Sequence, residues 1–160
     1  MKTAIPALSA LALCAAAPAW SQALPACPFK AAELSKSLGA GFQEGKVGME
    51  IPAAGMVIRD CRYQSRDITL MVKSTVFTQP ADARKSLAIM AGKLTPLPND
   101  PDGAVVQSDQ GDLTSPALHY ARQGVAIELR ILGIYYKGLK STPQELRDMQ
   151  ARLAGLRRVP

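Results

Sequence analysis

The sequence predicts an α+β domain of two layers, in which helices pack on one face of a mainly antiparallel sheet of about 5–6 strands. Short runs of alternating apolar and polar residues, typical of half-buried strands, occur in two groups of three. Stretches with apolar residues three and four positions apart, typical of amphipathic helices, stand before, between and after these groups. Short turn sequences inside each group favour hairpins and therefore antiparallel pairing. The expected order is α-βββ-α-βββ-α.

Residues 1–23 are expected to be a cleaved signal peptide. Lys2 provides a positive start, residues 5–19 form an apolar run rich in alanine and leucine, and residues 21–23 provide the small residues that signal peptidase needs. The run is too short for a membrane span of about 20 residues. We therefore expect a periplasmic or secreted protein without a transmembrane segment, whose mature part is a single α+β domain at residues 24–160.

Two of the three cysteines are expected to form a disulfide. Cys14 lies in the apolar run of the signal and is expected to be removed with it. Its surroundings resemble a lipidation box, but Leu13 stands where a small residue is required, so lipidation is the alternative. Cys27 and Cys61 remain as a pair, and paired cysteines form disulfides in an oxidising compartment. A redox or metal pair would need CxxC spacing or a neighbouring histidine, which this pair lacks.

The first half is predicted to contain a helix followed by three strands. Pro28 is well placed to open a helix over residues 29–38, and Gly39 stands where a C-terminal cap is expected. The strands are predicted at residues 47–51, 56–64 and 68–77. The third strand has the clearest alternation, and residues 64–66 are expected to form the hairpin turn that precedes it.

A helix and a stiff loop are predicted to connect the two halves. The helix begins at Pro80, and its apolar stripe comprises Ala83, Leu87, Met90 and Leu94. Residues 95–103 contain three prolines, which remove backbone donors and fix φ. A stiff surface loop is therefore predicted there.

The second half repeats the order of the first, which indicates an internal structural repeat. Its strands are predicted at residues 104–107, 116–122 and 125–134. Residues 142–145 read Thr-Pro-Gln-Glu, a capping box with proline at the first helical position, so the last helix is expected to begin there. The buried stripe of that helix is expected to comprise Leu146, Met149, Leu153 and Leu156.

Short motifs near the start of the mature chain resemble a known family. They are Cys27-Pro28-Phe29, Ala32-Glu33-Leu34, Leu38-Gly39 and Cys61-Arg62-Tyr63. This pattern is similar to that of small secreted lipoproteins of unknown function, the domain of unknown function 3558 type. The chain departs from the family because it lacks a sound lipidation cysteine. The resemblance implies a disulfide between Cys27 and Cys61 and an envelope location, and it implies no activity.

The charge pattern argues against a nucleic-acid partner. The formal net charge is +6, or +5 once Lys2 is removed, and the basic residues are scattered along the chain. Their one tight cluster is Arg157-Arg158. Nucleic-acid binding surfaces instead concentrate basic residues and interleave aromatic ones. Solubility and a weak attraction to an anionic envelope explain this charge more simply.

No catalytic residue, cofactor or metal site is predicted. His119, the one histidine, lies in a predicted strand as a half-buried or surface residue, and the chain contains no GxSxG nucleophile elbow. One histidine and two disulfide-bonded cysteines cannot form a zinc site. Residues 100–103 and Asp109 resemble a calcium loop, but Pro98 occupies its first ligand position. A turn explains this loop better.

Binding is therefore the preferred class of function. Aromatic and basic residues that suit a protein or an anionic surface follow the last strand: Tyr135, Tyr136, Lys137 and Lys140. The methionines either line an adaptable apolar pocket or serve as core filler: Met49, Met56, Met71 and Met90. We expect an exported, non-enzymatic domain that binds another envelope protein as an adaptor or inhibitor. A carrier of a small apolar ligand and a cell-wall-active hydrolase are the alternatives.

Overall fold

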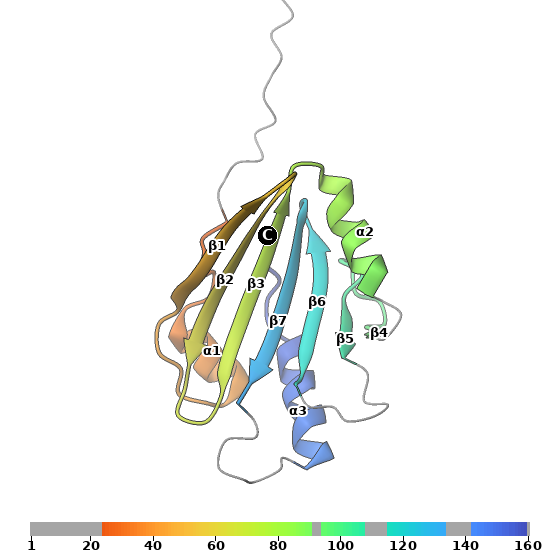
Figure 1. The fold of residues 1–160 in the computed structure, drawn as a ribbon. Helices are drawn as coiled ribbons and strands as arrows, with labels where there is room; N and C mark the ends of the chain where they lie inside the picture. Colours follow the sequence, from red (N-terminus) through yellow and green to blue (C-terminus); the bar gives the residue numbers. More distant parts are fainter. Residues whose placement is uncertain (1–23, 91–93, 108–114, 134–141, 160) are drawn as a thin grey trace, which may run out of the picture.

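The described residues form one seven-stranded antiparallel sheet and three helices (Figure 1). The computed structural model describes residues 24–90, 94–107, 115–133 and 142–159. The helices are α1 (Ala31–Leu38), α2 (Pro80–Met90) and α3 (Pro143–Ala154). The strands are β1 (Lys46–Ala53), β2 (Met56–Gln64), β3 (Thr69–Phe77), β4 (Leu94–Pro96), β5 (Val105–Gln107), β6 (Ala117–Arg122) and β7 (Val125–Leu132). The predicted α+β class with an antiparallel sheet is confirmed.

The strand order is β1-β2-β3-β7-β6-β5-β4, so two antiparallel meanders meet where β3 pairs with β7. Along β7, buried and half-buried residues alternate from Val125 to Leu132, as the period of two predicted. The turn between β6 and β7 uses Gln123 and Gly124, whose φ values are 50° and 79°. Two consecutive residues with positive φ are typical of a two-residue hairpin loop.

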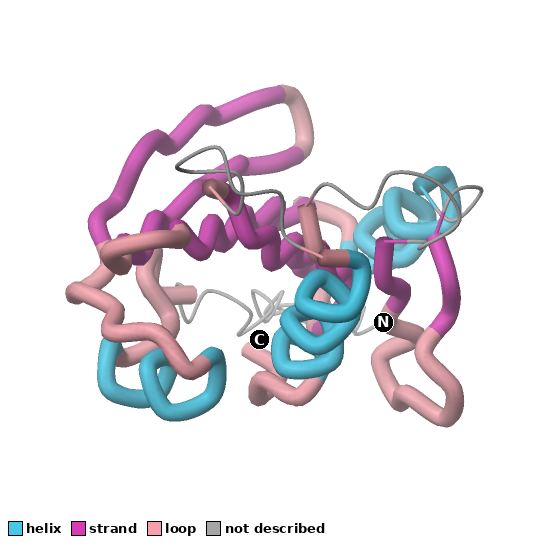
Figure 2. The backbone as a smooth tube through the Cα atoms, turned by 90° about the horizontal axis from the view of Figure 1, so that it is seen from below, coloured by secondary structure: helices cyan, strands magenta, loops and turns pink. Residues whose placement is uncertain are grey.

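Helices α1 and α3 pack on one face of the sheet, which we call the covered face (Figure 2). The strands contribute most of the core there: Cys61, Tyr63, Leu70, Val72, Val106, Leu118, Tyr120, Val125, Ile127, Leu129 and Ile131. The helices contribute Leu34, Leu38 and Leu153. Apolar burial is the dominant favourable term in folding, so this layer holds most of the stabilising contacts.

Helix α2 packs on the opposite face, which we call the polar face. Its Ala83 and Leu87 contact Ala121, whereas the adjacent Tyr120 belongs to the core of the covered face. Successive side chains of a strand point to opposite faces, so α2 lies across the sheet from α1 and α3. This differs from the prediction that all helices share one face. Helical periodicity identifies an apolar stripe, but it does not say which face of a sheet that stripe meets.

The far edge of the sheet also differs from the prediction. Leu94–Pro96 forms β4 and pairs with β5, where the sequence predicted the end of a helix and the start of a stiff loop. The sheet therefore has seven strands instead of five or six. An edge strand tolerates proline because the missing N–H faces away from the neighbouring strand. The two halves of the chain agree with the predicted internal repeat in that each has a meander of strands followed by a helix. The two helices, α2 and α3, lie on opposite faces of the sheet.

The helix ends follow the local signals of the sequence. Gly39 ends α1 in the left-handed conformation with φ 73°. At the start of α3, Thr142 Oγ1 accepts from the N–H of Glu145 at 3.2 Å, and the Glu145 carboxylate accepts from the N–H of Thr142 at 2.7 Å. The predicted capping box is thus confirmed. None of the helices in the described part of the chain is long and apolar enough to cross a membrane.

Candidate functional site

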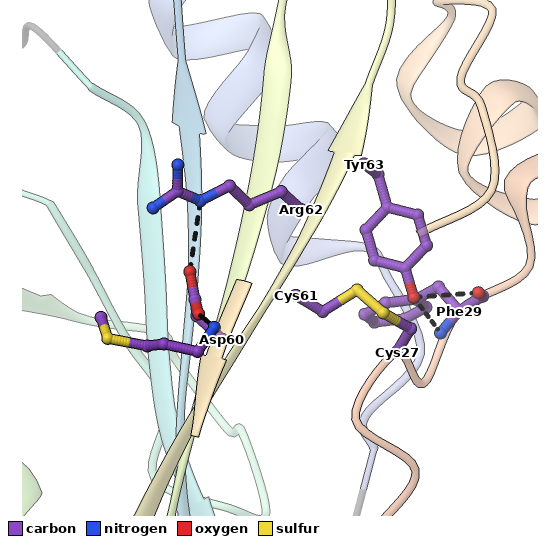
Figure 3. The surroundings of a disulfide bond; sticks show 7 residues. Cys27, Phe29, Asp60, Cys61, Arg62 and Tyr63 are labelled. Atoms are coloured by element: carbon purple, nitrogen blue, oxygen red, sulfur yellow. Dashed lines mark hydrogen bonds and ion pairs between the residues drawn. A yellow bond between two sulfur atoms is a disulfide. The ribbon is translucent and has the colours of Figure 1, made fainter. Parts of the chain in front are cut away.

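The predicted disulfide joins Cys27 to Cys61 of β2, with 5.3 Å between their Cα atoms (Figure 3). Tyr63 of the same strand also binds the N-terminal segment. Its hydroxyl accepts from the N–H of Phe29 at 2.8 Å and donates to the C=O of Phe29 at 2.9 Å. Burial raises the pKa of Tyr63, which therefore stays protonated near neutral pH. The disulfide and the tyrosine together attach the N-terminal segment to the covered face.

Strand β1 is an exposed edge of the sheet. All eight of its residues are exposed, and within the described residues no strand lies on its outer side. Three of the four large apolar side chains exposed in the described part of the chain lie on it: Val47 at 57%, Met49 at 48% and Ile51 at 45%. The fourth is Ile89 of α2, at 85%. An edge of this kind is a surface to which another extended segment can add by backbone hydrogen bonding.

A β-bulge interrupts β1 near its middle. The pairing with β2 shifts between Val47 and Glu50, so Gly48 and Met49 together oppose Asp60. The Asp60 carboxylate is buried and accepts a hydrogen bond from the N–H of Met49. A Cβ at Gly48 would lie 2.6 Å from both Asp60 carboxylate oxygens. The bulge therefore needs glycine on one strand and a short acid on the other.

Two rows of mostly charged residues run across the polar face beside this bulge. The basic row crosses β1, β2, β3 and β7 and comprises Lys46, Arg62, Met71 and Arg130, each opposite the next in register. The mixed row crosses β2, β3, β7 and β6 and comprises Asp60, Lys73, Glu128 and His119. A pocket of about 320 Å³ opens at the β1 end, and Lys46, Asp60 and Arg62 contribute to its lining.

Each acid of the mixed row binds an arginine of the basic row on the same strand. Arg62 Nε lies 3.2 Å from Asp60 Oδ2, and Arg130 Nε lies 2.6 Å from Glu128 Oε1. The acids are 3% and 17% exposed, whereas Arg62 and Arg130 are 54% and 29% exposed. Each guanidinium group therefore rests on a more deeply buried carboxylate and keeps N–H donors toward solvent.

His119 lies at the β6 end of the mixed row and is only 3% exposed. Its Nδ1 atom has no hydrogen-bond partner among the described residues. Burial lowers the pKa of His119, and the neighbouring Arg130 and Lys73 lower it further, although Glu128 opposes them. The sequence predicted a half-buried or surface histidine, whereas the structure buries the imidazole.

The loop that resembles a calcium site is organised by its own aspartate. Asp100 Oδ1 accepts from the N–H groups of Asp102 at 3.0 Å and Ala104 at 3.2 Å, and Oδ2 accepts from Arg158 at 2.6 Å. Burial alone would raise the pKa of Asp100, but the bonds from Arg158 and the loop amides hold it below its usual value. Asp109 lies outside the described residues. The contacts of Asp100 are those of a turn.

The binding residues expected from the sequence cannot be placed. Tyr135, Tyr136, Lys137 and Lys140 all lie outside the described residues. Met56 and Met71 are half-buried on the polar face, opposite Phe77 and Arg130, so they do not lie between the sheet and helices α1 and α3. Sequence reasoning missed both charged rows because their members come from four strands. The signal in the sequence was the pair of charged residues two positions apart in each of two strands, Asp60 and Arg62 in β2 and Glu128 and Arg130 in β7, which places each pair on one face of the sheet.

No group of three His, Cys, Asp or Glu side chains that could hold a metal ion occurs among the described residues. The chain matches no protein-family model, and it matches no curated protein sequence. The edge strand and the charged rows are therefore the basis for assigning a function.

Proposed function

We propose that this chain is an exported, non-enzymatic domain that binds another envelope protein, as an adaptor or inhibitor. In this proposal an extended segment of the partner pairs with the outer side of β1. The observation that carries it is the exposure of the whole edge strand together with Val47, Met49 and Ile51. Backbone hydrogen bonds would supply affinity, and the exposed side chains would supply specificity.

The register of β1 defines the segment that would fit. Val47 lies opposite Cys61 on the covered face, whereas Ile51 lies opposite Ile58 on the polar face. The partner strand therefore needs an apolar residue on each of its two faces. Lys46 lies opposite Arg62 at the start of β1, so an acidic residue of the partner is favoured at that end.

The edge is protected in a way that favours one specific partner. Natural sheets discourage unwanted pairing with bulges and with charged residues on edge strands. β1 has the bulge at Gly48 and Met49, and it has the charged residues Lys46 and Glu50. These devices oppose nonspecific association but leave three apolar side chains exposed. The disulfide supports an oxidising location, where such a partner would be met.

The test compares charged substitutions on and off the edge. The double variant Val47→Lys/Ile51→Lys should lose the partner, because lysine would place charge in an apolar contact. Ile89→Lys is the matched control, since Ile89 is equally apolar and more exposed but lies on α2. Wild type, double variant and control would be used to capture partners from envelope extract, and a captured protein would then be purified and titrated against each variant.

Hydrogen exchange of the purified complex gives the second measurement. The amides of β1 should become protected on binding, and the control should bind within about twofold of wild type. Equal binding by wild type and the double variant would contradict the proposal. Protection confined to another element, or a homodimer that buries β1 in the absence of any partner, would contradict it as well.

A further inference from the structure

We infer that the basic row forms a binding site for a small oxyanion, either a carboxylate or a phosphate group. Lys46, Arg62 and Arg130 would supply the donors, and Met71 would form the floor between the two arginines. This site lies on the polar face, next to the strand pairing proposed for the outer side of β1, and the two have Lys46 in common. The inference rests on the placement of the cations, on the orientation of the arginines and on the pocket.

Without a bound anion, the placement of the cations in the basic row destabilises the pairing of β1 with β2. Lys46 lies directly opposite Arg62, and like charges in that relation destabilise a strand pair. Arg130 lies two strands beyond Arg62 in the same row, with the neutral Met71 between them. The basic row thus contains three cations and no acid. A bound anion would remove the repulsion between Lys46 and Arg62.

The two arginines are already oriented for an anion. Each Nε donates to a carboxylate of the mixed row, at 3.2 Å for Arg62 and 2.6 Å for Arg130. A guanidinium group fixed through Nε keeps its terminal N–H groups for a second acceptor in a planar, bidentate geometry. Neighbouring strands lie about 4.8 Å apart, so the two Cα atoms are separated by roughly 10 Å. Two long side chains can converge on one oxyanion over that span.

The charge balance favours an anion over a cation. Asp60 and Glu128 are each paired with an arginine, which leaves Lys46 and Lys73 in excess. Neither lysine makes an ion pair within the described residues. A pocket of about 320 Å³ lies at the β1 end of the basic row, and it is large enough for a small molecule that carries a carboxylate or phosphate group. Lys46 and Arg62 line it together with Asp60, whereas Met71 and Arg130 lie outside its lining.

The experiment titrates the full mature chain with inorganic phosphate and with succinate at constant ionic strength, maintained with sodium chloride. Side-chain Nε–Hε signals of the arginines are followed by NMR. At least one of the two probes should shift the signals of Arg62 and Arg130 with saturation. Arg130→Gln should weaken binding at least tenfold, whereas Arg147→Gln on α3 should change it less than twofold. The probe that binds identifies the class of oxyanion.

Arg62→Gln is a poor test by itself, because it also removes the ion pair of the buried Asp60 and so changes stability. A second variant that leaves the fold unchanged is needed at the β1 end of the basic row. Lys46→Gln meets this need because Lys46 is exposed, and it should weaken binding at least threefold with an unchanged unfolding midpoint. Saturable shifts that are weakened by Arg130→Gln and Lys46→Gln support the site. Shifts by neither probe, or an equal loss in Arg147→Gln, would overturn it.

Discussion

At the residue scale, two tyrosines make the same pair of hydrogen bonds, one to the first described segment of the chain and one to the last. Tyr63 of β2 binds both backbone groups of Phe29, and Tyr120 of β6 binds both backbone groups of Val159, at 3.0 Å from its N–H and 3.4 Å to its C=O. Both tyrosines are fully buried on the covered face. Each therefore satisfies two polar groups that burial would otherwise leave unpaired.

Removing either hydroxyl should destabilise the fold. Tyr63→Phe and Tyr120→Phe should each lower the free energy of unfolding by roughly 1–3 kcal/mol, because a buried N–H and C=O lose their partner. Urea unfolding followed by circular dichroism measures the change. The slope against urea should stay constant, since the compactness of the native state is unchanged. A loss below about 0.3 kcal/mol would show that water replaces the hydroxyl.

His119 should make stability depend on pH. Its folded-state pKa lies below the ordinary value of 6.5, because burial, Arg130 and Lys73 outweigh Glu128. Below pH 6.5 the unfolded state therefore binds more protons, and the free energy of unfolding falls as the pH is lowered from that value. His119→Gln should show a shallower decline between about pH 7 and about pH 5. Identical declines for both proteins would contradict this assignment.

At the element scale, the bulge in β1 depends on contacts between two strands. The sequence predicted a strand over residues 47–51 only. The structure shows an eight-residue strand, because Asp60 binds the extra residue of the bulge. A local pattern does not reveal this contact, since the acid belongs to the following strand.

Two glycine substitutions separate this contact from a general effect of glycine. Gly48→Ala should lower the free energy of unfolding by about 1–3 kcal/mol, because its Cβ would lie 2.6 Å from the Asp60 carboxylate and disturb the bond to Met49. Gly41→Ala is the control, since its Cβ would meet no atom within 4 Å. The control should be neutral or slightly stabilising. Equal losses in both variants would indicate a general effect of replacing glycine in this segment, and not the contact with Asp60.

At the scale of the whole molecule, the first and last segments of the described chain are fastened to each other and to the rest of the domain. Arg157 donates to Glu33 at 2.6 Å and to the C=O of Pro28 at 2.5 Å, and its guanidinium lies 5.0 Å from the ring centre of Phe29. Arg158 donates to Asp100 at 2.6 Å. The one tight basic cluster of the sequence therefore serves internal contacts, which the sequence did not indicate.

The disulfide fastens the same N-terminal segment covalently. The Cys27→Ala/Cys61→Ala variant should lower the free energy of unfolding by about 3–4 kcal/mol, because the bond closes a loop with a sequence separation of 34 residues. Urea unfolding of the oxidised wild type, of the reduced wild type and of the variant measures the effect. The reduced wild type and the variant should agree. A difference below about 1 kcal/mol would mean that the tyrosine and arginine contacts suffice.

The sequence by itself determined the α+β class, the order of most elements, the caps of α1 and α3, and the cysteine pair. These depend on short-range patterns: a period of two, a period near 3.6, turn residues, and a capping box. Only the tertiary structure decided the face on which α2 packs, the pairing of β4 and the composition of the two charged rows. These features depend on how strands that are distant along the chain pair with one another. The local sequence pattern of a strand does not specify its partner strand or the residues that lie opposite each other.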